Sequence, residues 1–600
     1  MKDRIPKDVY IDTIRKLNDQ LDQLNKKKAA LSWLRLISFL TAVLLLWLLW
    51  PKGLLIALAA FVIVFAGFLF FVSKDLANKA AIDNTLLLLR VNKEELSFLE
   101  HQFTQFPDGN NLQPELHPYA NDLDVFGRAS LYQYINRTTS QQGNQLLATW
   151  LLTPAVATVI TQRQEAVKEL TAQHEWRQQL QAYGLSKQLT LKTEENITSW
   201  LREENRFTNT LHWKILRFLL PALSITCLVL HLNDIIPQQP FYSLMLLFLA
   251  ISLGISKKIM PAWTKLGKIT AELETLSESI SLVEKHSFES PLLQQLKKTF
   301  SPANDQTASS NIRALKKILD RLDYRLNPIV FIPLSIFLCW DLQQIFALEK
   351  WKKKNQQQLR DWFVSLAQLE ALSTLGNISF NHPEWCFAEL ATGEAVFTGE
   401  EIGHPLIPAG KRINNSFTTT GINKISLITG SNMAGKSTFL RSTGINIVLA
   451  MMGAPVCARS LTLSPMKVMS SMRISDNLEE STSTFYAELK KLKEVIEAVN
   501  KNEKVFLLLD EILRGTNSAD RHAGSKALIK QLIHHKAVGM VATHDLELAK
   551  LEKEYPENIH NYHFDVQVAN DELFFDYKLK EGVCQSMNAS ILMKKIGIEL

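Results

Sequence analysis

Two long apolar runs stand near the start of the chain. Leu34 to Trp50 is almost wholly apolar, Leu54 to Val72 carries no charge, and residues 51–53 form a Pro-Lys-Gly turn between them. At about 1.5 Å per residue, each run is long enough to cross ~30 Å of hydrocarbon. A buried hairpin and a signal peptide are the alternatives. Two adjacent runs with tryptophans near their ends favour a membrane hairpin over 34–72.

A second apolar pair follows at Trp213 to Leu232 and Phe241 to Ser256, joined by a polar loop. Both runs are shorter, but Lys214 and Arg217 near the start are placed to reach a membrane interface. The pattern predicts a second transmembrane hairpin over 213–256. The bilayer is therefore an expected partner.

Basic residues predict how these hairpins are oriented. The two connecting loops carry only Lys52, whereas both pairs are flanked by positive charge, which marks the cytoplasmic side. The sequence thus predicts an integral protein of the cytoplasmic membrane, with both termini and all large polar parts in the cytoplasm. The flanking residues are Lys26, Lys27, Lys28, Arg35, Lys74, Lys79, Lys214, Arg217, Lys257 and Lys258.

The polar parts between and after the hairpins have helical periodicity. Residues 258–300 repeat apolar positions at helical spacing, and Ile312 to Arg325 reads as an amphipathic helix. Ile329 to Trp340 is apolar but short and contains Pro333, so we expect a packed core helix there, with membrane contact as the less favoured alternative. Residues 340–375 are expected to continue as one long helix. The predicted core stripe of 258–300 is Leu273, Leu276, Ile280 and Val283.

Composition adds little to this picture. The chain has 600 residues, a formal net charge of +6 and 46% hydrophobic residues, so several domains are expected. Its five cysteines include no Cys-x-x-Cys pair, which indicates neither a disulfide framework nor a metal site of cysteines. The mild basic excess is weak support for nucleic-acid binding, because much of it flanks the apolar runs.

Candidate chemistry lies in the last third of the chain. Ile425 to Ile428 reads as a buried strand, followed by two glycines that bracket four residues, then Lys436 and Ser437. In such a loop the backbone N–H groups face phosphate oxygens, the lysine reaches the β- and γ-phosphates and the serine holds Mg²⁺. The predicted nucleotide-binding residues are Gly430, Ser431, Asn432, Met433, Ala434, Gly435, Lys436, Ser437 and Thr438.

Two further strands end in polar residues. Residues 505–509 are apolar and lead into Asp510 and Glu511, a candidate Mg²⁺ ligand and a candidate base for the attacking water. Residues 539–543 lead into His544, a candidate γ-phosphate sensor. A lone histidine is usually structural, but its place at a strand end beside these motifs favours a catalytic role.

Four segments together resemble the ATPase domain of the MutS DNA mismatch repair proteins: GSNMAGKST, STSTFYAEL, LLLDEILRGTNSADR and ATHDLEL, in the family's order. The resemblance implies an ATP hydrolase using Mg²⁺, and a homodimer in which Ser483 and Thr484 of the second segment reach the γ-phosphate across the interface. One departure is Leu513, where the family usually has glycine.

A second resemblance lies between the hairpins. Asn121 to Gly127, Ser130 to Thr138, Gly143 and Arg163 to Val167 are similar to the start of the helical core of MutS proteins. In that family an N-terminal domain reads the mismatch and a clamp inserted in the core grips DNA. Here no soluble N-terminal domain of that size is evident, and the clamp interval carries the second apolar hairpin.

The expected fold class is multidomain: a helical core and lever domain, an α/β P-loop ATPase domain and two transmembrane hairpins. The function expected is a membrane-anchored MutS-type ATPase whose ATP-driven dimer closure changes its conformation, with DNA binding implied by the family. The alternative is a non-DNA membrane machine in which closure moves the hairpins. The expected boundaries are 1–33, a cytoplasmic helix; 34–72, hairpin 1; 73–212, first half of the core; 213–256, hairpin 2; 257–395, second half and lever; and 396–600, the ATPase domain.

Overall fold

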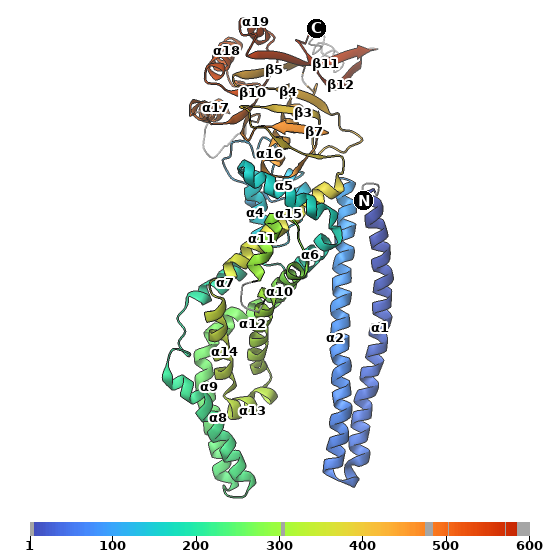
Figure 1. Ribbon diagram of the computed structural model, residues 1–600, viewed down its shortest axis with the longest axis vertical. Coiled ribbons are helices and arrows are strands. Elements are labelled where there is room, and N and C mark those ends of the chain that lie inside the picture. Colours follow the sequence, from blue (N-terminus) through green and yellow to red (C-terminus); the bar gives the residue numbers. More distant parts are fainter. Residues whose placement is uncertain are drawn as a thin grey trace. The chain divides into compact units, whose positions relative to one another are not determined.

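The structure, a computed structural model, describes residues 5–301, 307–431, 433–473, 484–501, 503–569 and 572–584 (Figure 1). The chain divides into two compact units. Unit 1 holds Met1–Glu95, Thr138–Asn144 and Glu175–Glu370, and unit 2 holds Leu96–Arg137, Gln145–His174 and Ala371–Leu600. This grouping differs from the boundaries expected from sequence, because residues 96–137 and 145–174 belong with the C-terminal sheet.

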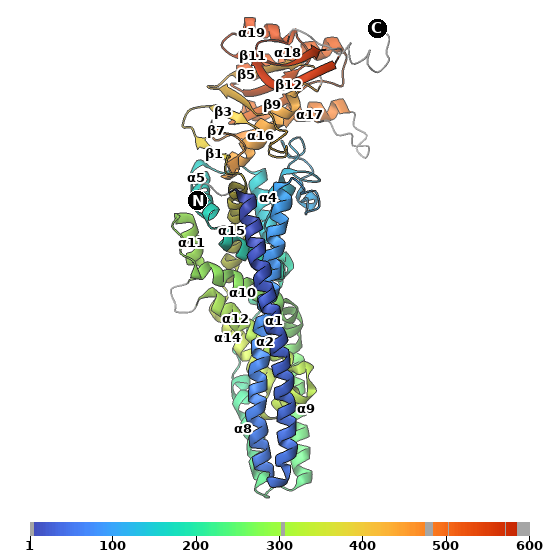
Figure 2. The same cartoon turned by 90° about the vertical axis from the view of Figure 1, so that its right-hand side faces the viewer.

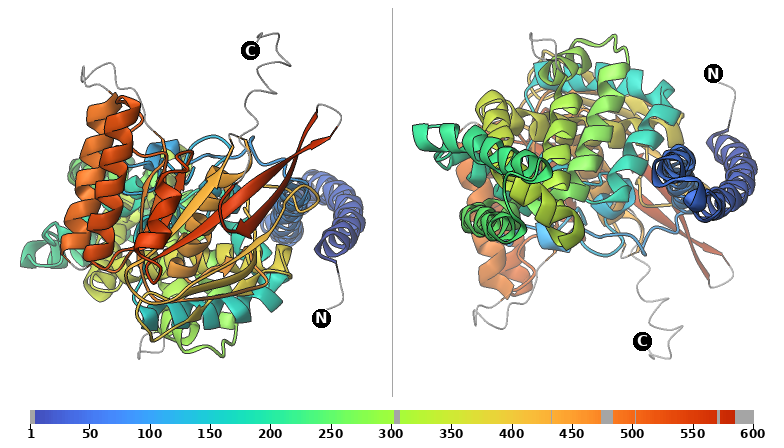
Figure 3. Two further views of the ribbon diagram at one scale, coloured as in Figure 1. Left: turned by 90° about the horizontal axis from the view of Figure 1, so that it is seen from above. Right: turned by 90° about the horizontal axis from the view of Figure 1, so that it is seen from below.

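The first hairpin is formed by two long helices of unit 1, α1 (Pro6–Leu49) and α2 (Leu54–Leu99), which lie side by side (Figure 2; end-on in Figure 3). An ion pair between Arg35 and Asp75 and a hydrogen bond from Asn78 Nδ2 to the Leu24 carbonyl (3.0 Å) join them. The apolar stretch of α2 leaves Leu55 84% exposed. Such a surface lacks a protein partner in this unit.

The second hairpin consists of α8 (Leu211–Leu232) and α9 (Gln238–Leu266), as the sequence predicts, although α9 extends about ten residues further. In the described part of the chain, four helices are long and apolar enough to cross a membrane, and they are the helices of these two hairpins. These helices meet the criterion by their length and residue composition alone.

Outside the hairpins, unit 1 is a bundle of shorter helices. The predicted stripe lies on α10 (Thr270–Lys285), and all four of its residues are fully buried, which confirms the periodicity. The predicted continuous helix after residue 340 is wrong, because a turn at 356–358 separates α14 from α15. Residues 356–358 are all glutamine, so the sequence has no glycine or proline there to mark the end of a helix. The remaining helices are α6 (His174–Ser186), α7 (Leu191–Arg202), α11 (Pro291–Phe300), α12 (Ala308–Leu322), α13 (Pro328–Leu338), α14 (Trp340–Asn355) and α15 (Leu359–Asn381).

The expectation of a packed core helix at 329–340 is also wrong. Ile329 is 85% exposed, and the only buried residue of α13 is Ser335. The run was assigned to the core because it is too short to span a bilayer. The structure instead buries Ser335, leaves six of the ten apolar or proline residues exposed and half-buries the other four.

Buried polar groups fix the helices of unit 1 to one another. Asn92 and Gln178 exchange amide hydrogen bonds of 3.1 and 3.0 Å between α2 and α6. The fully buried Glu370 carboxylate accepts from Thr139 Oγ1 (2.8 Å) and Ser140 Oγ (2.6 Å), and burial raises its pKa. A Cβ at Gly143, in the first turn of helix α4 (Gln141–Leu152), would lie 2.2 Å from Glu370 Oε2, which explains why glycine is needed there.

Unit 2 is built on a six-stranded sheet of order β12-β11-β5-β10-β9-β8, in which only the β11–β12 pair is antiparallel. The inner strands are continuous apolar runs, as expected for parallel strands buried on both faces. Figure 3 shows the β11–β12 pair at the edge of this sheet. The bounds are β5 (Lys424–Gly430), β8 (Lys467–Ser471), β9 (Val505–Asp510), β10 (Val538–Thr543), β11 (Ile559–Ala569) and β12 (Glu572–Glu581).

Helices and a smaller sheet cover the two faces. Residues of α17 (Thr484–Asn500) and α18 (Ser518–His534) share one core cluster with Leu427, Leu507 and Leu509. On the other face α16 (Lys436–Met452) packs so closely that a Cβ at Gly444 would be 2.6 Å from Leu508. Other elements are α3 (Leu131–Ile135), α4 (Gln141–Leu152), α5 (Ala157–Ala172), α19 (Leu551–Glu554), β1 (Cys386–Phe387) paired with β6 (Pro455–Val456), and the sheet β2 (Glu389–Leu390), β7 (Ser460–Leu463), β3 (Phe397–Ile402) and β4 (Asn415–Thr419).

Candidate functional site

The register of the parallel strands brings the sequence-predicted residues to one edge. Thr543 of β10 pairs with Thr429 of β5, and Ala542 pairs with Asp510 of β9. The glycine-bracketed loop, the two carboxylates and His544 therefore all follow strands that end at the same level. Ligands of open α/β sheets bind at this carboxyl edge.

The loop between β5 and α16 requires its two glycines for different reasons. Gly430 has φ of 150°, and a Cβ there would be 2.9 Å from the Phe564 carbonyl oxygen. Gly435 has φ of 108°, and a Cβ would be 3.1 Å from the Tyr577 ring. Both values of φ are disfavoured for other residues. Asn432 lies outside the described residues.

Lys436 is the most constrained cation of the site. Its side chain is 4% exposed, and Nζ donates to the carbonyls of Gly430 (2.8 Å) and Ser431 (2.9 Å). Burial lowers the Lys436 pKa to about 8, although Glu511 and Asp510 oppose that shift. The ammonium is thus held at the loop in a form that a phosphate group would favour.

Ser437 and Asp510 provide a donor set that fits Mg²⁺. Ser437 Oγ donates to Asp510 Oδ2 at 2.5 Å, while Asp510 Oδ1 is buried and makes no hydrogen bond to any described residue. No group of three metal-ligating side chains occurs in the described part of the chain. Mg²⁺ does not need one, since it is usually bound by one or two protein oxygens together with substrate phosphates and water.

Glu511 is clamped on both carboxylate oxygens. Oε1 lies 2.6 Å from His544 Nε2, and Oε2 lies 3.0 Å from Arg514 Nε. The hydrogen bond with His544 is the main reason that the Glu511 pKa is lowered, so the group stays a carboxylate at neutral pH. His544, expected as a phosphate sensor, therefore contacts the candidate base, and its Nε2 is also 3.4 Å from Lys436 Nζ.

The turn after Glu511 explains the departure at Leu513. Leu513 has φ of 62°, a left-handed conformation that glycine adopts without cost and other residues at about 1–2 kcal/mol. The Glu488 carboxylate on α17 accepts the backbone N–H groups of Leu513 and Arg514 (3.2 Å for the latter). The left-handed turn is thus kept without glycine, and a buried carboxylate holds it.

A cleft of about 500 Å³ opens beside the loop. Loop residues and Glu511 form its polar end. Its other walls come from β3, the segment after it and the β11–β12 pair. They are mostly apolar but include Lys411 and Asn415, a lining suited to a phosphate chain joined to a ring system. Sequence reasoning missed these wall residues, which are Ile402, Ile407, Ile413, Phe564 and Tyr577.

Asp122 was also missed as a positioning residue. It is 1% exposed, accepts the backbone N–H groups of Met472 and Arg473 at 3.2 Å each, and accepts Lys491 Nζ at 3.1 Å. It therefore grips both β8 and α17, the elements before and after the predicted in-trans segment. Ser483 lies outside the described residues; α17 begins at Thr484, whose side chain is not described.

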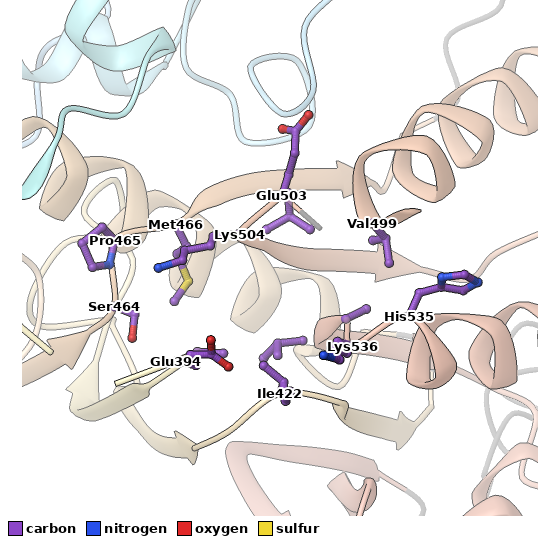
Figure 4. Close-up of a pocket in the computed structure, with 14 residues that line it drawn as sticks. Glu394, Ile422, Ser464, Pro465, Met466, Val499, Glu503, Lys504, His535 and Lys536 are labelled. Carbon is purple, nitrogen blue, oxygen red and sulfur yellow. The ribbon is translucent and has the colours of Figure 1, made fainter. Parts of the chain in front are cut away.

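A second cavity, of about 250 Å³, lies at the opposite, amino edge of the sheet (Figure 4). Ile422, Met466 and Val499 line it together with Glu394 and Lys536. Its lining includes no residue of the glycine-bracketed loop. It is therefore separate from the candidate site.

Part of the chain is similar to known proteins. The family model described as MutS domain V matches residues 426–596. "MutS protein homolog 4" of Homo sapiens is 35% identical over 205 residues, 32% of this chain and 22% of the relative. "DNA mismatch repair protein MutS" of Treponema pallidum (strain Nichols) is 28% identical over 268 residues, 43% and 29%. The protein of that name from Desulfatibacillum aliphaticivorans is 30% identical over 226 residues, 36% and 25%. The chain thus spans less than a third of each of these relatives.

The depressed pKa of Lys436 predicts how nucleotide affinity depends on pH. Below about pH 8 the lysine is charged in the free protein, and binding needs no proton uptake. Above that pH binding must also protonate it, so affinity for an ATP analogue should fall by up to roughly tenfold per pH unit. Equilibrium titration with Mg²⁺ between about pH 7 and about pH 9 measures this, with circular dichroism confirming the fold. A flat profile would contradict the assignment.

Proposed function

The chain belongs to the MutS family, and on that premise we propose that it binds and hydrolyses ATP at the carboxyl edge of β5, β9 and β10. One observation carries the proposal: a buried lysine, a serine–aspartate pair and a histidine-bound glutamate converge on one loop from three separate strands. A structural role alone would not need five ionisable or metal-ligating side chains at one strand edge.

In this proposal each residue has one task. Backbone N–H groups of the loop and Lys436 hold the β- and γ-phosphates. Ser437 and Asp510 hold Mg²⁺, which when bound neutralises phosphate charge. Glu511 takes the proton of the attacking water, and His544 orients Glu511 from the side of the lysine.

The clamp on Glu511 supports a role for dimerisation. With Oε1 on His544 and Oε2 on Arg514, neither oxygen is directed only to water. We propose that closure of two ATPase domains, with Ser483 and Thr484 of the partner subunit entering at the γ-phosphate, opens the Arg514 contact. ATP then joins the two domains and hydrolysis releases them.

We further propose that the hairpins anchor the protein in the cytoplasmic membrane, with its termini and ATPase domain in the cytoplasm. The exposed apolar surfaces of α1, α2, α8 and α9 support this, because exposed apolar patches of that extent are unfavourable in water. The basic residues at the polar ends of these helices set the orientation.

The natural ligand is the remaining question. The relatives' printed names support binding of DNA. A second proposal, a DNA-independent membrane machine, is favoured by α8 and α9: the interval that would hold a DNA clamp is instead two exposed apolar helices. In that case ATP-driven closure moves the hairpins.

We expect Glu511→Gln to retain nucleotide binding and lose about 10²–10⁴-fold in turnover, because only the general base is removed. It should accumulate as a nucleotide-bound dimer, measured by phosphate release and light scattering. Glu503→Gln, a matched change at the opposite end of β9, should leave turnover unchanged. Near-normal hydrolysis by Glu511→Gln would exclude the assigned mechanism.

The topology is tested by cysteines placed one at a time in intact cells. An impermeant thiol reagent should label Lys52→Cys and Asn233→Cys, which lie in the short exposed connections. Lys26→Cys and Asn110→Cys, also exposed in the structure, should react only after the membrane is permeabilised. Labelling of Asn110→Cys in sealed cells would refute the two-hairpin arrangement.

Mismatch recognition is expected to be weak. Kinking DNA at a mismatch needs an inserted apolar wedge and phosphate contacts. The interval of α8 and α9 is too apolar to grip phosphates, because its basic residues lie only toward the helix ends. We predict less than about tenfold preference (~1.4 kcal/mol) for a single-mismatch duplex over homoduplex. Competition binding at one near-physiological salt concentration measures it, since low salt inflates phosphate contacts. A preference of about a hundredfold (~2.7 kcal/mol) would restore the mismatch-reading role.

A further inference from the structure

The helix α13 presents an apolar surface with no protein cover in the described part of unit 1. Ten of its eleven residues are apolar or proline. Six of these ten are exposed, with Ile329 at 85% and Ile332 at 42%, and the other four are half-buried. Ser335, the one polar residue, is 1% exposed. A surface helix in water shows the reverse pattern.

This surface is continuous with the second hairpin. Ser224 Oγ of α8 donates to the Phe337 carbonyl of α13 at 3.4 Å, and Ser252 Oγ of α9 lies 4.0 Å from Cys339 Sγ at the end of α13. Figure 1 shows α13 beside α8 and α9. The medium that covers the exposed sides of α8 and α9, whether water or lipid, therefore also covers α13.

Aromatic and basic groups lie together at one corner beside α13. The rings of Tyr324, just before it, and Trp340, just after it, stack at 5.8 Å. The Arg325 guanidinium lies 4.9 Å from the Trp263 ring. Tyrosine, tryptophan and arginine together are typical of the level at which hydrocarbon meets headgroups.

Length and direction exclude a crossing. Eleven residues reach only about 16 Å, half of the hydrocarbon thickness. The chain then bends by 79° at Cys339 into α14. α14 cannot continue the path through lipid, because it buries Asp341, Glu349 and Lys352 in the helical core.

We infer that α13 lies along the bilayer within the cytoplasmic leaflet, with phospholipid acyl chains covering its outer side. This rests on the proposed membrane anchoring and adds a third lipid-contacting element to it. The buried Arg325–Asp341 ion pair (2.5 Å) holds the corner between α13 and α14. α14 and α15 lead along the chain into unit 2, so the leaflet is joined covalently to the ATPase domain.

Depth-dependent fluorescence quenching tests the inference on the full-length chain. Ile329→Cys carries an environment-sensitive fluorophore in a Cys227→Ala, Cys386→Ala background, since the other three cysteines are buried. The protein is reconstituted in vesicles of phosphatidylcholine and phosphatidylglycerol. Leu246→Cys on α9 (72% exposed) is the membrane control, and Leu191→Cys on α7 (39% exposed) is the aqueous control. Ile332→Cys provides a second reporter on α13.

Nitroxide-labelled lipids should remove most emission from the labels at Ile329, Ile332 and Leu246, and iodide should quench only the label at Leu191. Iodide quenching at Ile329 and Ile332, with lipid quenching at Leu246, would overturn this inference and leave the anchoring intact. Shielding of the α13 labels from both quenchers would assign the surface to a second copy of the chain and also overturn it. Iodide quenching at Leu246 would remove the anchoring itself.

Discussion

Parallel pairing of β5, β9 and β10 is the constraint on which the rest of unit 2 depends. Because these strands end at one level, a loop lysine, two carboxylates and a histidine from distant parts of the chain meet within hydrogen-bonding distance. The buried apolar side chains of these strands fix the register, because a slipped strand would lose their packing. A slip between β5 and β9 would also separate Ser437 from Asp510. The chemistry of the edge is thus held in place by the core beneath it.

That edge holds the carboxylate of Glu511, the candidate base, in a restrained state. Glu511 and Leu513 both have left-handed backbone conformations, at roughly 1–2 kcal/mol each, and Glu488 secures the turn from α17. Strained residues that surrounding structure over-determines are common where a site must switch. Glu488 joins α17 to the turn after Glu511, and Asp122 joins α17 to the residues that follow β8. Both are therefore tied to the helix that follows the predicted in-trans segment.

Unit 1 combines two environments in one fold. Buried amides and the Glu370 carboxylate join its helices by hydrogen bonds, which lose strength if geometry loosens. Its hairpins and α13 instead expose apolar surface that only lipid or another protein would cover. Under the proposed membrane anchoring, this unit would connect the bilayer to the chain segments that lead into unit 2.

The sequence alone determined the elements whose signals are local. Apolar runs predicted both helical hairpins and helical spacing predicted the α10 stripe. Loop spacing singled out Lys436 and Ser437 as candidates, and strand ends singled out Asp510, Glu511 and His544. Tertiary structure decided what local signals do not carry. It paired His544 with Glu511, built the cleft walls from β3 and β11–β12, and made Asp122 a clamp, because these contacts join residues far apart in the chain. It also reversed the assignment of α13: an apolar run specifies that water is excluded, and only packing shows whether protein or another apolar medium excludes it.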